Sequence, residues 1–218
     1  MNRINEEWVV DLNKALADSI RDRCENKKLL LTLTGGMDTR TILSILLNLG
    51  YSFDSFTYRS SKPEVSYFVD KDVKIAEKLS RIYGFNPVFH FGDSNWGDDG
   101  LKYLRRDYDV VLGGGAMSEF FNMFEYNKSS MYEIKKDKLD KRIRSINEND
   151  IFAPVLDPRV LDVVKHIPIC YRMFGIIQRE IIRLNEPDLL NVSYAEKSVM
   201  REMESRLYRF LIYHRWFI

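Results

Sequence analysis

The sequence predicts an α/β fold with a parallel sheet, followed by a helical C-terminal half. Up to about residue 126, short apolar runs alternate with segments of helical periodicity, which is typical of right-handed β–α–β units. Beyond residue 150 the recurring patterns are helical. We divide the chain into an α/β part at 1–126, a charged and mobile segment at 127–150, and a helical part at 151–218. We expect the helical part to pack on the first, giving one structural domain.

The elements of the first half follow from the spacing of apolar residues. Residues 5–24 place apolar side chains on one helical face, and residues 29–33 form a continuous apolar run, typical of a strand buried on both sides. A helix from Asp38 to Leu49 follows, and Gly50 ends it. The remaining strands are predicted at 54–59, 87–91 and 108–114, and the remaining helices at 70–83, 99–106, 157–166, 171–185 and 195–216.

Composition and charge narrow the class of protein. With 45% hydrophobic and 30% charged residues among 218, the chain has the balance of a soluble globular protein. The formal net charge of +1 argues against a large basic surface that would bind nucleic acid. Cys24 and Cys170 form no C-x-x-C motif, which favours a reducing compartment and argues against a zinc ribbon or an iron–sulfur cluster. Neither a membrane-spanning run nor a secretory signal core is found, so we expect a cytoplasmic protein.

Two glycine-rich turns are the candidates for function. Thr34–Asp38 follows the strand at 29–33, and Gly113–Gly115 lies at the end of the strand at 108–114. In open parallel sheets, ligands lie at the carboxyl ends of strands, where backbone N–H groups and the positive end of a helix suit an anion such as phosphate. Asp38 could then hold a divalent cation on the phosphate oxygens. A structural interpretation stays open, in which the first turn is a tight connection and Asp38 is a helix N-cap.

The first turn belongs to a longer segment with a family pattern. "LTLTGGMDTR" at 31–40 resembles the S-G-G-x-D-S pyrophosphate loop of the N-type ATP pyrophosphatases, also called the PP-loop superfamily. Within that superfamily it is most similar to the synthetase domain of asparagine synthetase. "VVLGGGAMSEFF" at 110–121 and "FAPVLDPRV" with its continuation to residue 187 are similar to two further motifs of that domain. The motifs occur in the family's order, and the resemblance covers residues 5 to about 190.

The resemblance implies a fold, a reaction and a set of residues. The fold would be adenine nucleotide α-hydrolase-like, a parallel five-stranded-type sheet with helices on both faces. The enzyme would be an AMP- and pyrophosphate-forming ligase that adenylates a small-molecule carboxylate with ATP and transfers it to ammonia or an amine. Mg²⁺ would bind Asp38, and Asp38 and Glu119 would be catalytic. The residues expected to bind ATP are Thr34, Gly35, Gly36, Met37, Asp38, Thr39, Thr57, Tyr58, Gly113 and Gly114.

The chain departs from the family pattern at three positions. Gly115 and Ser118 stand where relatives carry acidic residues, and Gly175 stands where relatives carry a lysine that stabilises charge during transfer. We expect Arg172 to supply that charge from a neighbouring helical turn, as the third catalytic residue, with Lys165 as the other candidate.

Two other functions stay open. The first is another PP-loop ATP pyrophosphatase, such as a tRNA-modifying enzyme, although the absence of C-x-x-C and the near-neutral charge count against it. The second is a degenerate, non-catalytic nucleotide-binding protein, which the three departures favour. The family's glutaminase cysteine at position two is Asn2 here, so we expect ammonia or an amine from a separate glutaminase. We expect neither a membrane nor a nucleic-acid partner, and oligomerisation is left open.

Overall fold

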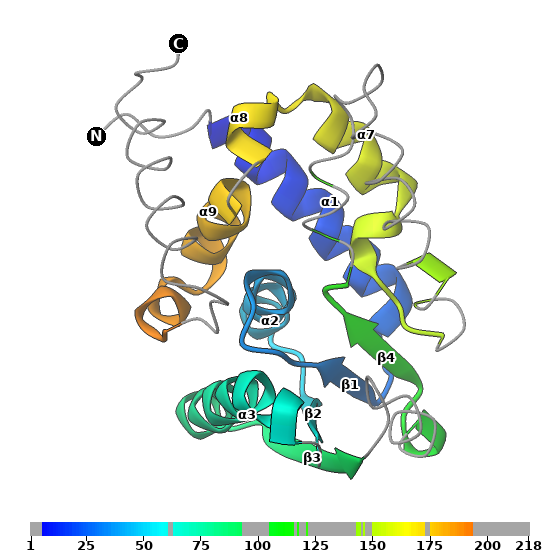
Figure 1. Ribbon diagram of the computed structural model, residues 1–218. Helices are drawn as coiled ribbons and strands as arrows, with labels where there is room; N and C mark the ends of the chain where they lie inside the picture. The colour runs from blue at the N-terminus through cyan, green and yellow to red at the C-terminus, as the bar shows by residue number, and fades with distance from the viewer. Residues whose placement is uncertain are drawn as a thin grey trace.

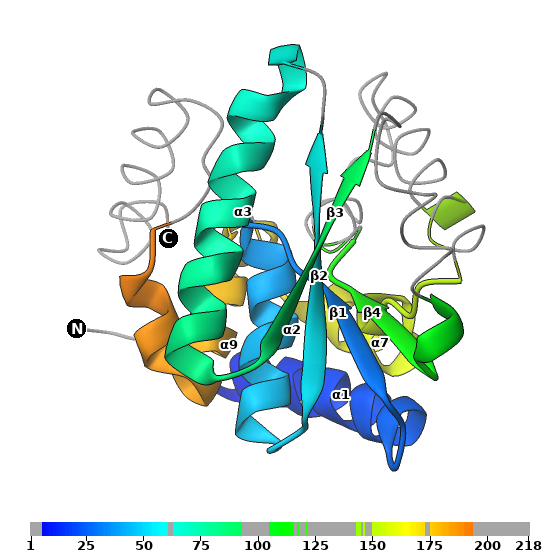
Figure 2. The same ribbon diagram turned by 90° about the horizontal axis from the view of Figure 1, so that it is seen from below.

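The protein has a parallel four-stranded sheet, as Figures 1 and 2 show in two views of the computed structural model. The structure describes residues 6–60, 63–92, 105–115, 117, 121, 143–144, 146, 150–172 and 175–193. The strands are β1 (Leu29–Thr32), β2 (Phe53–Ser60), β3 (Asn86–Gly92) and β4 (Val110–Gly113), in the order β3-β2-β1-β4. Every neighbouring pair is parallel, which confirms the predicted α/β class.

Helices precede, connect and follow the strands. The α-helices are α1 (Glu6–Cys24), α2 (Met37–Asn48), α3 (Pro63–Tyr83), α7 (Pro158–His166), α8 (Ile169–Arg172) and α9 (Ile176–Asn185). The 3-10 turns are η1 (Arg105–Asp107), η2 (Pro154–Leu156) and η4 (Pro187–Asn191).

Alternation along β1 assigns its side chains to the two faces of the sheet. Leu29, Leu31 and Leu33 join the main core with residues of α1, α2 and α3. Leu30 points the other way and forms a second cluster with Phe56 and Val111. The helices that the structure describes beside the sheet cover the first face, as Figure 1 shows. A helix on the second face stays a prediction.

The helical half packs on the helices that cover the sheet. In Figure 1, α7 lies along α1, and α9 lies against both α1 and α2. Asp157 caps α7 by accepting a hydrogen bond from the Arg159 backbone N–H at 2.9 Å. The Arg159 guanidinium also pairs with Asp22 of α1 at 2.8 Å. Apolar residues from both halves share one core cluster, among them Leu16 of α1 and Ile177 of α9.

Several predicted boundaries were wrong for local physical reasons. The helix predicted at 70–83 begins at Pro63, because proline suits the first helical position. The helix predicted at 171–185 is two helices, α8 and α9, because Gly175 adopts the left-handed conformation with φ of 68° between them. In place of a fifth strand, the described residues show Phe152 making a single parallel bridge to Leu112.

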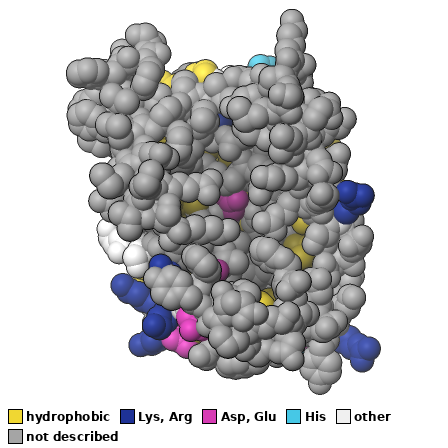
Figure 3. Space-filling view, viewed as in Figure 1, with side chains coloured by type: hydrophobic (Ala, Val, Ile, Leu, Met, Phe, Trp, Pro, Cys, Tyr) yellow, Lys and Arg dark blue, Asp and Glu magenta, His cyan; other side chains and the backbone are white. Residues whose placement is uncertain are grey.

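Some predictions fall outside the described residues. These are the helix at 195–216, most of the charged segment at 127–150, and the helix at 99–106 apart from its last turn in η1. Among the described helices, none is both long and apolar enough to cross a membrane. On the face in Figure 3, the described Lys and Arg side chains are spread around the rim, some of them beside acidic groups.

Arg40 of α2 connects the first half of the chain to residues 189–193, which follow α9. Its side chain is fully buried, at 0% exposure. The guanidinium donates hydrogen bonds to the carbonyl oxygens of Leu189 at 3.2 Å, Val192 at 2.6 Å and Ser193 at 3.0 Å. These oxygens lie at the end of η4, where free carbonyl groups carry partial negative charge. A buried cation is therefore balanced by backbone acceptors.

Replacing Arg40 by methionine should destabilise the fold. Arg40→Met removes the donors and deprives the buried Val192 carbonyl oxygen of its 2.6 Å hydrogen bond to a charged group, so we expect a loss of about 3 kcal/mol in the free energy of unfolding. The control is Arg21→Met, which removes an exposed ion pair with Asp18 and should cost less than about 0.5 kcal/mol. Urea denaturation of both variants measures the difference, and equal losses would contradict the anchoring role of Arg40.

Candidate functional site

The two glycine-rich turns meet at the point where the strand order reverses. From β1 the chain moves to β2 and β3 on one side, and β4 then pairs with the other side of β1. Thr32, the last residue of β1, is aligned with Gly113, the last residue of β4. Ligands of open parallel sheets bind outside the carboxyl ends of strands at such a switch point. The topology therefore places both turns at the edge where the sequence predicts them.

Backbone contact joins the β4 turn to the first turn of α2. A Cβ atom built on Gly114 would lie 2.5 Å from the carbonyl carbon of Asp38 and 2.5 Å from the backbone nitrogen of Thr39. Such distances do not occur for real side chains, so only glycine allows this approach. At Gly113 a Cβ atom would also collide, at 2.7 Å from the Ile151 side chain. Gly114 thus lets the two predicted binding segments meet, and Gly113 makes room for Ile151 beside them.

Short hydrogen-bonded links fix the shape of the first turn. The Thr34 backbone N–H donates to the Thr39 hydroxyl at 3.3 Å, and the two hydroxyl oxygens are 3.2 Å apart. The Gly36 N–H donates to the Thr34 hydroxyl oxygen, also at 3.3 Å. From α3, the Asp72 carboxylate accepts a hydrogen bond from the Gly35 N–H at 2.7 Å. The turn is therefore held from within and from the neighbouring helix.

The first turn of α2 provides donors for an anion. Its N-cap is Gly36, which has no side chain to cap the first N–H groups. Asp38 lies inside the helix as its second residue, so the structural interpretation of Asp38 as the N-cap is wrong. The N-terminal N–H groups and the helix dipole make this end of α2 suitable for phosphate.

Asp38 is the residue that could hold Mg²⁺ here. The described residues include no group of three or more Asp, Glu, His or Cys side chains placed to bind a metal. A single carboxylate is nevertheless compatible with Mg²⁺, which is commonly bound by one or two carboxylates together with substrate phosphates and water. The Asp38 side chain is half-buried, and its Oδ1 atom accepts a hydrogen bond from Gln178 at 3.4 Å. The donor set therefore fits a metal that arrives with a nucleotide.

The two residues predicted on β2 lie on opposite faces of the sheet. Thr57 is buried, and its hydroxyl donates to the Leu33 carbonyl oxygen at 2.8 Å. Thr57 therefore supports the strand that leads into the turn. Tyr58 packs against the second cluster, and the centroid of its ring is 6.5 Å from the centroid of the His90 ring. Of the ATP-binding set, Thr34–Thr39 and the β4 glycines are brought together, whereas Tyr58 faces away from the main core.

Arg172 occupies a buried position in α8. Its side chain is 1% exposed, and Nη1 donates to the Phe121 carbonyl oxygen at 2.9 Å. This contact anchors Phe121, and a catalytic role for Arg172 stays a prediction. Lys165 of α7 is exposed and pairs with Asp162 at 3.9 Å. Glu119 and Ser118 lie outside the described residues.

Two of the departures from the family pattern have distinct surroundings. A Cβ atom on Gly115 would be 3.4 Å from the Ile146 side chain, an ordinary contact that the backbone would tolerate. Gly175 is the N-cap of α9 and lies beside Met37 of the first turn. A Cβ atom built on Gly175 would be 3.5 Å from Met37 Cγ. Because φ at Gly175 is 68°, a lysine at this position would be strained.

Asp72 and Gln178 are contacts of the turn that the sequence did not predict. Asp72 lies in the helix predicted at 70–83, where the spacing of apolar residues gives no sign of a contact with the turn. Gln178 lies within an apolar helical segment. A polar residue on a predicted core face indicates a functional contact, so this position could have been identified from the sequence. Their partners are 37 and 140 residues away along the chain, beyond the reach of local patterns.

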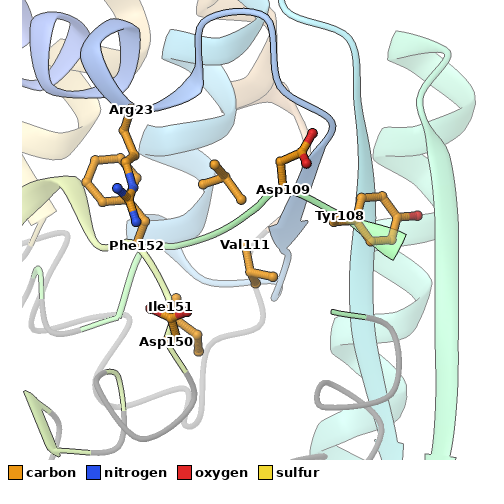
Figure 4. A pocket seen from close by; sticks show the side chains of 8 residues that line it. Arg23, Tyr108, Asp109, Val111, Asp150, Ile151 and Phe152 are labelled. Carbon is orange, nitrogen blue, oxygen red and sulfur yellow. The ribbon is translucent and has the colours of Figure 1, made fainter. Parts of the chain in front are cut away.

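A separate pocket lies beside the start of β4. Its walls include Arg23, Tyr108, Asp109 and Phe152, whose side chains Figure 4 shows. The Tyr108 hydroxyl donates to Asp54 at 2.6 Å. Burial of the tyrosine, with a further contribution from this carboxylate, raises the pKa of Tyr108 to about 12. The residues that line this pocket include none of those predicted to bind ATP.

Comparisons with known proteins give structural similarity at low identity. A scan against protein-family models finds no match, and a search of curated proteins finds none. Among solved structures, the chain is similar to U34-tRNA thiolase NcsA from Methanococcus maripaludis with its 4Fe-4S cluster (12% identity, TM-score 0.47, 96% of this chain and 75% of that chain). It is also similar to NMN synthetase from Francisella tularensis (12%, 0.41, 98% and 96%). With TM-scores below 0.5, these likenesses assign neither family nor activity.

A methyl group at Gly114 should force the two turns apart. We expect Gly114→Ala to lower the free energy of unfolding by about 1–3 kcal/mol, because the backbone of α2 must move to relieve the collision. The matched control is Gly115→Ala, whose Cβ atom would make an ordinary contact with the Ile146 side chain at 3.4 Å among the described residues and should change stability by less than about 0.5 kcal/mol. Denaturant unfolding of both variants is the measurement. Equal stabilities for the two would contradict the close approach.

Proposed function

We propose that the protein binds ATP at the junction of the two turns and cleaves it to AMP and pyrophosphate. The backbone contact between Gly114 and the first turn of α2 carries this proposal, because it brings both glycine-rich segments to the switch point of the sheet. The pyrophosphate would lie on the N–H groups at the start of α2, as the resemblance to the S-G-G-x-D-S loop implies. Asp38 would hold Mg²⁺, which neutralises charge on the phosphate oxygens.

The narrower proposal is an amide ligase similar to asparagine synthetase. A substrate carboxylate oxygen attacks the α-phosphorus of ATP, the bond to the β-phosphate oxygen breaks, and pyrophosphate leaves with an acyl-adenylate remaining. Ammonia or an amine then attacks the acyl carbon, loses a proton and displaces AMP. The residues of the turn contribute by orienting the phosphates and by stabilising the charge on the leaving pyrophosphate, so donors matter more than a general base.

A nucleotide-binding protein without catalysis is the second candidate. It is favoured by the absence of a charged side chain at Gly175, next to Met37, and by the use of Arg172 to hold the Phe121 carbonyl oxygen. Such a protein would bind ATP at the same turn but would not form AMP. Incubation with ATP, Mg²⁺ and a panel of carboxylates, followed by assay of AMP and pyrophosphate, separates the two candidates.

Both candidates predict that ATP with Mg²⁺ stabilises the fold. A ligand that binds only the folded state contributes RT ln(1 + [L]/Kd), or about 2.7 kcal/mol at a hundredfold excess over Kd. We therefore expect a higher melting temperature with millimolar ATP and Mg²⁺ than with Mg²⁺ alone. An unchanged melting temperature would contradict the proposed nucleotide site, and with it both candidate functions.

Asp38→Asn tests the role assigned to the carboxylate. The amide keeps the size of the side chain but not the charge that binds Mg²⁺, and a metal contribution of several kcal/mol to the transition state is common. Each 1.36 kcal/mol changes a rate about tenfold, so pyrophosphate release should fall by about a hundredfold or more. The thermal unfolding midpoint without ligand serves as the control and should change little. A variant with undiminished pyrophosphate release would exclude Asp38 as the metal ligand.

A further inference from the structure

The side chain of Gln178 reaches from the helical half to Asp38. Gln178 is the third residue of α9 and is 1% exposed. Its Nε2 atom donates to Asp38 Oδ1 at 3.4 Å, which is longer than the 2.7–3.2 Å of a well-formed hydrogen bond. The amide orientation follows from chemistry, because the reversed amide would place its oxygen against a carboxylate oxygen.

The other half of the amide has no partner. Gln178 Oε1 is buried and accepts no hydrogen bond, although a buried amide oxygen left unpaired destabilises a fold. An apolar side chain of the same length would avoid this cost in the surrounding core of α9, which contains Ile177 and Ile181. Local stability therefore does not explain why glutamine occupies this position.

Helix capping does not explain it either. A glutamine at the third helical position often reaches back to the N-cap backbone N–H in a capping box. Here the N-cap is Gly175, and among the described residues Gln178 Oε1 makes no hydrogen bond to it or to another group. Within the same residues, the hydrogen bond of this side chain goes to Asp38, across the junction of α9 and α2.

We propose that Gln178 is a positioning residue that orients the Asp38 carboxylate toward Mg²⁺, a role that rests on the proposed function. With Nε2 on Oδ1, one rotamer of Asp38 is favoured and the carboxylate keeps lone pairs for the metal. Catalytic hydrogen bonds of this length commonly tighten when substrates bind. A Cβ atom at Gly175 would be 4.0 Å from Gln178 Oε1 and 3.5 Å from Met37 Cγ, both ordinary contacts, so the left-handed φ of 68° is what favours glycine beside this amide.

Two isosteric variants test this role. Gln178→Met removes both polar atoms, and Gln178→Glu keeps the acceptors but loses the N–H donor. We expect the Mg²⁺ concentration for half-maximal pyrophosphate release to rise about tenfold in both, since a hydrogen bond to a charged group is of this size. The Mg²⁺-dependent part of the melting-temperature increase caused by ATP should shrink in parallel, while binding of ATP without Mg²⁺ stays within about twofold.

Stability distinguishes this role from a structural one. Gln178→Met removes an unpaired buried oxygen, so its melting temperature without ligand should equal or exceed that of the wild type. The matched control is Ser55→Ala, because Ser55 Oγ in β2 is also buried without a partner. Ser55→Ala should leave the Mg²⁺ dependence unchanged.

Each outcome decides for or against the proposal. A tenfold shift in Mg²⁺ dependence in both Gln178 variants, but not in Ser55→Ala, supports it. A shift within twofold overturns it, as does an equal loss of Mg²⁺-free ATP binding, which would indicate general damage to the turn. If the wild-type protein itself neither binds nor cleaves ATP, the proposed function fails and this role fails with it. An active wild type with unaffected Gln178 variants overturns this role alone.

Discussion

The closeness of the Gly114 backbone to α2 is the constraint on which the candidate site depends. β1 and β4 are neighbours in the sheet, so the turns that follow these two strands lie close together at the same edge. A side chain at Gly114 would collide with the backbone of Asp38 and Thr39. Because position 114 carries no side chain, the start of α2 can lie against the end of β4. The site is therefore a consequence of strand order and of one missing Cβ atom.

Polar contacts from three directions then hold α2 and its turn in place. Asp72 of α3 accepts the Gly35 N–H, Gln178 of α9 donates to Asp38, and Arg40 of α2 donates to carbonyl oxygens near η4. Each contact joins segments that are distant in the chain, in a setting where an unpaired buried polar group is costly. The helical half is for this reason part of the support of the turn, in addition to covering α1.

The distribution of positive charge around the turn shapes the proposed chemistry. Gly175 contributes no charge, and Arg172 is buried with a hydrogen bond to the Phe121 carbonyl oxygen. Stabilisation of a leaving pyrophosphate would then depend on the N–H groups and dipole of α2 and on the metal at Asp38. In the part of the chain that the structure describes, a site of this kind depends strongly on the orientation of the Asp38 carboxylate, because no group of three or more Asp, Glu, His or Cys side chains is placed there to hold the metal instead.

The sequence alone determined the features that depend on neighbours in the chain. The continuous apolar run at 29–33 predicted β1, the glycine-rich turn predicted the start of α2 near Asp38, and the alternation of strands and helices predicted a parallel sheet. Backbone preference and hydrophobic periodicity act over a few residues, so these signals can be interpreted locally. A local signal was also overlooked at Gly175, whose left-handed conformation divides α8 from α9.

Tertiary structure alone decided which distant groups meet at the turn. Gln178 and Asp38 are 140 residues apart, Arg40 and Leu189 are 149 apart, and no periodicity links either pair. The strand order that brings Gly114 to α2 is likewise set by packing of the helices on the sheet. From its residue type alone, Arg40 is predicted to be exposed. The fold places carbonyl oxygens around its guanidinium, and these acceptors allow its burial. Partners of this kind depend on how the helices pack in three dimensions, which local patterns do not encode.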